Sequence, residues 1–332
     1  MSDLTIGLLG ALLATNQPQA VSNLVQQQTG ISIVVKTNDP VEQELDRLMD
    51  EDDAARDEVD RWIQSNNALA ATGAGESKEA LNARIDARFG LVRTNYQNFL
   101  QRHPNSARGY LAYGTFLDDI GQETAGKVQL ENSRQMDPNN PAAWNALANF
   151  YGETGELTNA FAYYARAIEL DPSEPVYYQN FATTVYLFRS DARNYFGITE
   201  PQVFDKALAL YQKAVQLDPE NFDLATDYAE TYYGIRPLRT NDALVAWTNA
   251  LKVAQNDIER EGVFIHLARI KTAAGRFAEA RAQLEAVTNA TYDVLKNQLA
   301  RNLAIRENAA TNAATATATN ATAITNTTPS GK

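Results

Sequence analysis

Few side chains in this sequence could do acid–base or metal chemistry. The 332 residues include only two histidines, His103 and His266, and no cysteine at all. His103 precedes a proline at a predicted helix end, and His266 lies on a predicted helix where a groove contact is possible but a catalytic base is not supported. Without cysteine, neither a disulfide nor a thiolate metal site can form.

The strings that mark common catalytic and phosphate-binding sites are absent as well. The sequence has no H-E-x-x-H, G-x-S-x-G or G-x-G-x-x-G motif. Residues 73–78 lack the glycine-to-lysine spacing of a phosphate loop, and no apolar strand precedes them. The neighbouring carboxylates Asp118 and Asp119 lie at a predicted helix end beside a turn, where solvated charge explains them better than catalysis. We therefore predict a non-enzymatic protein without a cofactor or metal site.

A recurring proline organises the chain that must position any binding residues. Asp-Pro steps occur at Asp137-Pro138, Asp171-Pro172 and Asp218-Pro219, and His103-Pro104 is a weaker earlier copy. The first three of these four prolines are spaced 34 residues apart. A period in this range is typical of stacked helical arrays, in which each unit buries its apolar face against its neighbours.

The residues between these prolines follow one pattern. Residues 141–174 contain, in order, Trp144, Leu147, Ala148, Tyr151, Gly155, Ala160, Tyr164, Ala167 and Pro172. This resembles the tetratricopeptide repeat (TPR), whose pattern runs W-x2-L-G-x2-Y, then A-x3-F, then P. Only Ala148, in place of glycine, and Tyr164, in place of phenylalanine, depart from it. The resemblance implies an all-α fold, a right-handed α-solenoid of antiparallel helix pairs with flanking helices.

Five units share this register. They cover residues 107–140, 141–174, 175–221, 222–260 and 261–290. Small residues such as Gly114 and Ala148 let paired helices approach closely. The first helix of a unit must stop at Gly121, Gly155 and Gly275, since glycine takes the left-handed conformation without steric cost. Proline cannot continue a helix interior, so each Asp-Pro step ends a second helix. A generic helical bundle would not hold this register through five units.

The third unit is longer than the others. Val185 to Ala207 spans 22 steps where Tyr151 to Ala160 takes nine, so 13 residues are added. We predict that both helices of this unit are lengthened and joined by a loop around residues 194–198, with a capping box at 199–202. The added aromatic residues either pack the taller hairpin, which is favoured, or form a protruding lip for a partner; they are Tyr186, Phe188, Tyr195, Phe196 and Phe204.

The resemblance also implies where a partner would bind. In TPR proteins the first helix of each unit lines a concave groove, commonly with its second, fifth, sixth, ninth and twelfth positions. The implied peptide-binding groove residues are Asn145, Asn149, Gln179, Asn180, Thr183, Thr226, Asp227, Glu230, His266 and Arg269, with Arg108, Leu111, Thr115, Asp223 and Tyr233 at related positions. Four of these residues carry amide side chains, and we call them the amide row: Asn145, Asn149, Gln179 and Asn180. Amides both donate and accept hydrogen bonds, so the amide row can pair with an extended peptide backbone. Alternatively, these positions are polar only because they face water.

The charge of the chain limits the kind of partner. A formal net charge of −12 argues against nucleic acid, which needs a basic face. TPR proteins that clamp the acidic tails of chaperones carry Lys or Arg at several groove positions, where this chain has leucine, asparagine and glutamine. Asp223, Asp227 and Glu230 instead favour a protein or peptide with a basic or neutral segment.

The N-terminal 39 residues form a separate apolar segment and linker. Residues 4–14 are apolar but too short to span a bilayer, which takes roughly 20 residues. Their length suits a secretory signal with a cleavage site at 20–22, yet Asp3 stands where such signals carry Lys or Arg. A possible signal or membrane anchor is therefore an alternative to an ordinary apolar segment. Accordingly, the cytoplasm is favoured over the periplasm or envelope.

Flanking helices are predicted on both sides of the array. Residues 40–106 should form N-terminal helices, one over 40–66 with a bend or solvated face at the acidic run 50–53, and one over 78–102, with a loop between. Residues 291–307 should form a capping helix. Residues 308–332 are rich in Ala, Thr and Asn and are predicted to be disordered.

These features leave three classes of function. The leading hypothesis is a non-catalytic scaffold or adaptor that binds a peptide segment in the concave groove. An exported or membrane-anchored assembly protein of the cell envelope is the second, and a regulatory subunit of an enzyme complex is the third.

Overall fold

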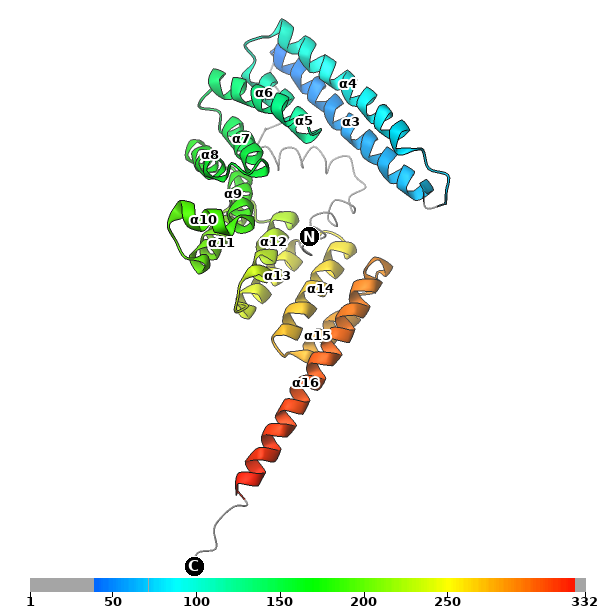
Figure 1. The fold of residues 1–332 in the computed structure, drawn as a ribbon, viewed down its shortest axis with the longest axis vertical. Coiled ribbons are helices and arrows are strands. Elements are labelled where there is room, and N and C mark those ends of the chain that lie inside the picture. The colour runs from blue at the N-terminus through cyan, green and yellow to red at the C-terminus, as the bar shows by residue number, and fades with distance from the viewer. Residues whose placement is uncertain (1–38, 71, 326–332) are drawn as a thin grey trace, which may run out of the picture. The chain divides into compact units, whose positions relative to one another are not determined.

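The computed structural model describes residues 39–70 and 72–325 (Figure 1). Throughout these two ranges the regular elements are helices, and the predicted all-α solenoid of antiparallel helix pairs is confirmed. Residues 4–14, the predicted signal or anchor, lie outside the described ranges. No helix within 39–325 is long and apolar enough to cross a membrane.

The described chain divides into two compact units at Ile198 and Thr199. This boundary falls inside the third predicted repeat, 175–221. The reason is the added segment of that repeat, which folds as a separate short helix before the boundary.

The first unit contains eight helices within residues 39–198. They are α3 (Pro40–Ala70), α4 (Lys78–Arg102), α5 (Ala107–Asp119), α6 (Glu123–Met136), α7 (Pro141–Glu153), α8 (Leu157–Leu170), α9 (Pro175–Leu187) and α10 (Arg189–Phe196). Neighbouring helices pack as antiparallel pairs, α3 with α4, α5 with α6 and α7 with α8. Within this unit, α5, α7 and α9 follow one side and α6 and α8 the other (Figure 1).

Local sequence rules explain where these helices begin and end. Asp137 and Asp171 follow the last residues of α6 and α8, as the Asp-Pro steps predict. Asn140 accepts a hydrogen bond from the amide of Ala142, which caps α7. The turns inside each pair use Gly121 and Gly155 at φ of +75° and +83°, the left-handed conformation expected of glycine.

The acidic run 50–53 neither bends α3 nor is wholly solvated, contrary to the prediction. Asp52 is only 4% exposed and accepts hydrogen bonds from Tyr96 Oη at 3.0 Å and Arg56 Nε at 2.8 Å. Arg56 also pairs with Asp119 of α5. The buried carboxylate therefore joins α3, α4 and α5, a tertiary role that helical periodicity could not reveal.

The inserted segment of the third repeat forms α10 rather than lengthening the first helix. The helix α9 has 13 residues, and the predicted loop at 194–198 is helical through Phe196 and turns at Gly197, whose φ is +66°. The rings of Tyr195 and Phe196 lie 5.2 and 5.5 Å from the ring of Phe161 on α8. Packing of these inserted aromatics is thus observed, although Tyr195 is still 42% exposed.

The second unit contains the remaining described helices, from residue 199 to 325. They are α11 (Glu200–Leu217), α12 (Phe222–Glu230), η1 (Thr231–Gly234), α13 (Thr240–Val253), α14 (Asp257–Ala273), α15 (Phe277–Glu285), η2 (Ala290–Tyr292) and α16 (Asp293–Thr325). The predicted capping box is present, since the amide of Thr199 donates to Gln202 Oε1 at 2.9 Å. As predicted, α11 is long, with 18 residues. The pairs are α12 with α13 and α14 with α15, and α16 packs on α14 and α15.

The C-terminal helix extends further than predicted. Helix α16 continues to Thr325, so the prediction of disorder from residue 308 is wrong for 308–325. Leu303 is buried against the α14–α15 pair, and the helix continues beyond it with side chains 308–315 exposed. Alanine has the highest helix propensity, so an alanine-rich stretch can propagate a helix that packing has already nucleated.

Glu261 ties the start of α14 to the segment before α16. This buried carboxylate accepts hydrogen bonds from the amides of Thr288 at 2.8 Å and Asn289 at 2.6 Å, and from Thr288 Oγ1 at 2.8 Å. These bonds, first that from the Asn289 amide, hold the pKa of Glu261 below its usual value.

We predict that Glu261→Gln will speed hydrogen exchange at the Thr288 and Asn289 amides, because a neutral amide oxygen accepts more weakly than a carboxylate. A group with a lowered pKa contributes stability above its unfolded pKa of 4.5 and loses it as pH falls through the folded value. The difference between variant and wild type should therefore be full at pH 7 and shrink below pH 4.5. The exposed Glu285→Gln on α15 is the control. Unchanged exchange at both amides would contradict the role of Glu261.

Asp118 differs from the solvated charge that the sequence suggests. It is half-buried at the end of α5, and its Oδ1 atom is buried without a hydrogen-bond partner. Burial, followed by the nearby carboxylates of Glu153, Asp119 and Glu123, raises the pKa of Asp118 to about 7. The charged form of Asp118 thus destabilises the fold.

We predict that Asp118→Asn will raise the free energy of unfolding by about 1–2 kcal/mol at pH 8. The folded pKa is raised, so stability is full below the unfolded value of 3.8 and is lost as pH rises through about 7. The gain should vanish near pH 4 and grow towards pH 8 in urea denaturation. Asp86→Asn, at an exposed position of α4, should show no such trend. A pH-independent difference would contradict the assignment.

Candidate functional site

The predicted groove residues of the first unit lie on its first helices. Asn145 and Asn149 are on α7, and Gln179, Asn180 and Thr183 are on α9. The structure brings these two helices together through the amides, because Asn180 Nδ2 donates to Asn145 Oδ1 at 3.2 Å. The amide row is therefore a physical cluster rather than a sequence coincidence.

Part of this amide row is structural. Asn145 is 0% exposed, so its side chain joins α7 to α9 and does not face a ligand. Asn149, Gln179, Asn180 and Thr183 are half-buried, which leaves some of each side chain accessible. Sequence reasoning could not separate buried from accessible amides, since both occupy positions with the same helical spacing.

A hydrogen-bond chain fixes the orientation of Asn149. Tyr164 Oη donates to Asn149 Oδ1 at 2.7 Å, and Thr184 Oγ1 donates to Tyr164 Oη at 3.2 Å. Burial raises the pKa of Tyr164, so the phenol keeps its proton. The hydrogen bond from Tyr164 therefore fixes the orientation of the Asn149 side chain.

The N-terminal end of the predicted groove is occupied by packing. Arg108 pairs with Glu42 at 2.8 Å and with Asp46 at 2.7 Å, both on α3, and Leu111 is 1% exposed. These contacts could not be predicted from the sequence, because the residues of the α3–α4 pair do not follow the repeat pattern. In contrast, Thr115 Oγ1 on the same face of α5 is buried without a hydrogen-bond partner.

The second unit gathers another set of predicted residues. Asp227 and Glu230 lie on α12, Tyr233 on η1, and His266 and Arg269 on α14. Thr226 Oγ1 bonds the carbonyl of Asp223 in its own helix at 2.8 Å, so this hydroxyl is used locally. The structure thus brings Tyr233, His266 and Arg269 together, whereas the hydroxyl of Thr226 bonds within its own helix.

His266 is the centre of this second set. Its Nδ1 lies 3.0 Å from Tyr233 Oη, and its ring stacks on Trp247 of α13 with centroids 4.0 Å apart and planes 14° apart. Arg269 lies over the Tyr233 ring at 5.4 Å. The repeat pattern did not implicate Trp247 in the groove, because its position belongs to the second helix of the unit.

Electrostatics make this histidine a hydrogen-bonding group rather than a proton carrier. Burial, followed by the charge of Arg269, lowers the pKa of His266 to about 3, so the imidazole is neutral at physiological pH. Burial also raises the pKa of Glu230, although Arg269 opposes the shift. General acid–base catalysis at neutral pH needs a pKa near 7, which His266 lacks.

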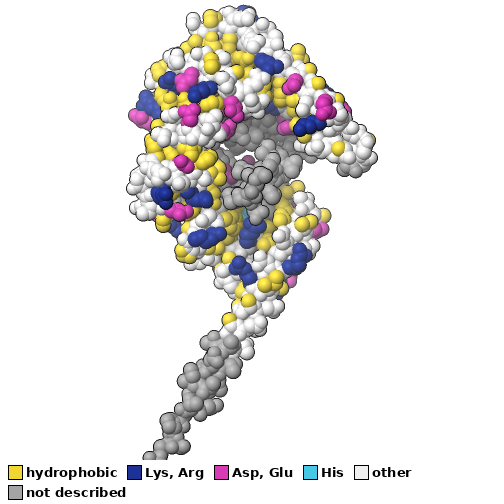
Figure 2. Space-filling model, in the orientation of Figure 1, with side chains coloured by type: hydrophobic (Ala, Val, Ile, Leu, Met, Phe, Trp, Pro, Cys, Tyr) yellow, Lys and Arg dark blue, Asp and Glu magenta, His cyan; other side chains and the backbone are white. Residues whose placement is uncertain are grey.

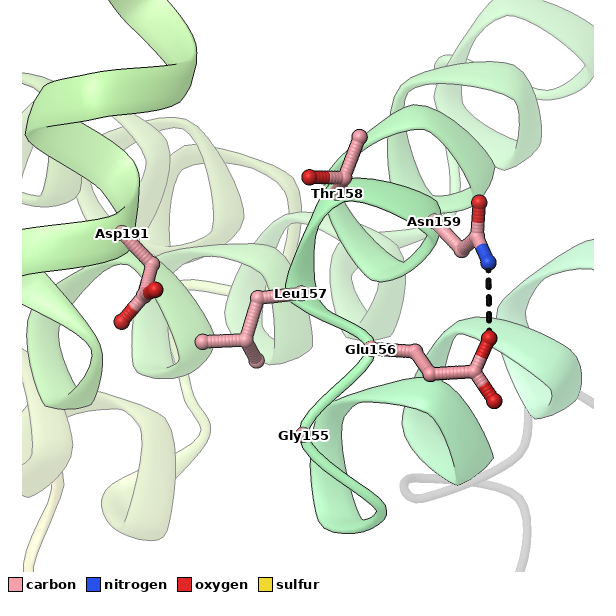
Figure 3. A pocket seen from close by; sticks show the side chains of 6 residues that line it. All are labelled: Gly155, Glu156, Leu157, Thr158, Asn159 and Asp191. Carbon is pink, nitrogen blue, oxygen red and sulfur yellow. Dashed lines mark hydrogen bonds between the residues drawn. The ribbon is translucent and has the colours of Figure 1, made fainter.

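A surface cavity of about 290 Å³ lies apart from the predicted groove residues (Figure 3). Its lining residues are Gly155, Glu156, Leu157, Thr158, Asn159 and Asp191. Asp191 comes from α10, and Asn159 Nδ2 bonds Glu156 Oε2 at 3.0 Å. The sequence could not predict this cavity because it depends on where α10 packs. Within the described ranges, no three His, Asp or Glu side chains are grouped to hold a metal ion.

Comparisons with known proteins agree with the repeat pattern. A tetratricopeptide repeat family model matches residues 141–174. No curated protein matches the sequence.

Several solved structures resemble the fold at low sequence identity. YrrB, described as a TPR protein with an unusual peptide-binding site, is 11% identical over 62% of this chain and 97% of its own, with a TM-score of 0.47. PilF of Pseudomonas aeruginosa is 12% identical over 75% of this chain and 99% of its own, with a TM-score of 0.49. PilW, a type IV pilus biogenesis factor, is 13% identical over 67% and 95%, also with a TM-score of 0.49.

The family match covers one repeat, residues 141–174, which forms the α7–α8 pair. The flanking helix pairs keep the same register of helix-ending Asp-Pro steps and glycine turns. The chain therefore contains a tetratricopeptide repeat at residues 141–174, within an all-α solenoid of helix pairs.

Proposed function

We propose that this chain is a non-catalytic scaffold or adaptor that binds an extended peptide segment against the first-helix faces of its repeats. The observation that carries the proposal is the oriented amide pair of Asn149 and Asn180. Asn149 is held by Tyr164 and Asn180 by Asn145. Side chains that are already fixed lose little conformational entropy on binding, so their hydrogen bonds contribute more fully to affinity.

Charge favours a basic or neutral peptide. Residues 39–198 contain 25 Asp and Glu against 14 Lys and Arg. Figure 2 shows acidic side chains over both the α3–α4 hairpin and the α5–α6 pair of the first unit. Complementary charge raises the association rate of a basic peptide, and repulsion between like charges disfavours the binding of an acidic one.

The first test of the proposal compares peptides that differ only in charge. Three twelve-residue peptides alternate serine with lysine, glutamine or glutamate. We expect the lysine and glutamine peptides to bind more tightly than the glutamate peptide in fluorescence anisotropy at low salt. The preference for lysine should fall as salt rises, because exposed charges are screened. Equal affinity for the lysine and glutamate peptides would contradict the proposed partner.

The second test removes the amides. Asn149→Ala/Asn180→Ala should weaken the best-binding peptide roughly tenfold, since each hydrogen bond contributes about 0.5–1.5 kcal/mol. The matched control is Asn98→Ala/Asn194→Ala, which removes two exposed amides from α4 and α10. If both double variants bind equally well, the amide row is polar only because it faces water.

A further inference from the structure

The described chain begins beside one end of the candidate groove. Helix α3 starts at Pro40, and near this start Glu42 and Asp46 pair with Arg108 of α5 at 2.8 and 2.7 Å. Arg108 occupies the predicted groove position at the start of α5. Residues 1–38, which precede the described part of the chain, are therefore joined to it next to the first-helix faces of the first unit.

The amides of α9 lie within reach of this starting point. Helix α5 packs next to α7, and α7 packs next to α9. Because packed helix axes lie about 8–10 Å apart, the face runs about 20 Å from α5 to α9. Residues 29–38 separate Gln28 from the described chain. An extended chain covers about 3.3 Å per residue, so this stretch is longer than the distance it must span.

Residues 16–28 carry side chains that complement the amide row. Seven of these 13 residues are Asn or Gln, and residues 26–28 are three glutamines in succession. Amides pair with one another, because each group both donates and accepts hydrogen bonds. The sequence has no charged residue between Asp3 and Lys36, so this segment is not repelled by the excess of acidic residues in the first unit.

We propose that residues 16–28 bind in the groove of their own chain, along the half-buried amides Asn149, Gln179 and Asn180, and that a partner must displace them. The inference rests on the proposed function, because the segment would occupy the face on which that partner binds. A segment tethered to its site has an effective concentration in the millimolar range. A contact too weak to hold a free peptide can therefore fill the groove when it forms within one chain.

The test uses the full chain and changes only the charge of the segment. Gln26→Glu/Gln27→Glu/Gln28→Glu keeps the size of three side chains but adds three negative charges, which the acidic unit disfavours. We expect this triple variant to bind the glutamine peptide roughly 3- to 10-fold more tightly than the wild type, because apparent affinity rises with the fraction of open grooves. Fluorescence anisotropy measures the difference.

The matched control adds the same charge elsewhere. Gln64→Glu/Gln101→Glu/Gln135→Glu changes three exposed glutamines, on α3, α4 and α6, and should bind the glutamine peptide as the wild type does. Thermal melting of both triple variants checks that the helices stay folded. A free peptide of residues 16–28 should compete with the glutamine peptide for the Gln26–Gln28 variant. The same free peptide with the three Gln→Glu changes should not compete.

A double-mutant comparison links the segment to the amides. The tenfold loss given above for Asn149→Ala/Asn180→Ala describes an open groove, and it should appear in full in the Gln26–Gln28 variant. In the wild type the loss should fall to roughly threefold, because the same substitutions also release the segment from the groove.

Three results would overturn the inference. They are equal affinity of the wild type and the Gln26–Gln28 variant, an equal loss from Asn149→Ala/Asn180→Ala in both, and a gain that depends on protein concentration, which would assign the segment to the groove of a second copy. If the glutamine peptide still binds and still responds to Asn149→Ala/Asn180→Ala, the proposed function stands without this contact. If neither the lysine nor the glutamine peptide binds either chain, both are wrong.

Discussion

The close approach of the two helices in each repeat is the constraint on which the rest of the structure depends. In the α5–α6 pair, a Cβ atom on Gly126 would lie 3.0 Å from the carbonyl oxygen of Gly114 and 3.0 Å from the amide nitrogen of Asp118. In the α7–α8 pair, Ala148 and Ala160 are 0% exposed. Interiors packed to this density transmit any added volume to the backbone. Small residues at these positions therefore fix the rotation of each helix about its axis.

That rotation determines which side chains reach the candidate site. With Ala148 turned towards α8, Asn145 meets Asn180 of the next repeat and Asn149 meets Tyr164. The same arrangement leaves the Thr184 hydroxyl against Tyr164. In the second unit, Ala268 is buried against Ala280, and two residues earlier His266 faces Trp247 and Tyr233. The rotation of each helix about its axis thus determines both how the paired helices pack and which side chains reach the candidate site.

Local rules made much of this architecture predictable from sequence. Gly121 and Gly155 adopt positive φ because only glycine does so without cost, and Asp137 and Asp171 end helices because proline follows them. Other features depend on tertiary contacts and could not be predicted from the sequence. Asp52 belongs to an acidic run but is buried by Arg56 and Tyr96. Asn145 has the spacing of a groove residue but is closed over by α9, and α10 is separate because its aromatics pack on Phe161.

The most direct test of this account makes one chemical change at two glycines. Gly126→Ala should lower the free energy of unfolding by about 1–3 kcal/mol, because the new methyl group meets backbone atoms of α5, which cannot move aside as a flexible side chain can. Gly90→Ala adds the same methyl group within α4, where the nearest atom is the flexible end of Arg93 at 3.6 Å. It should raise stability by about 0.5–1 kcal/mol through helix propensity. Urea denaturation of both variants measures the difference. A Gly126→Ala protein as stable as the wild type would contradict the claim that close helix approach sets the register.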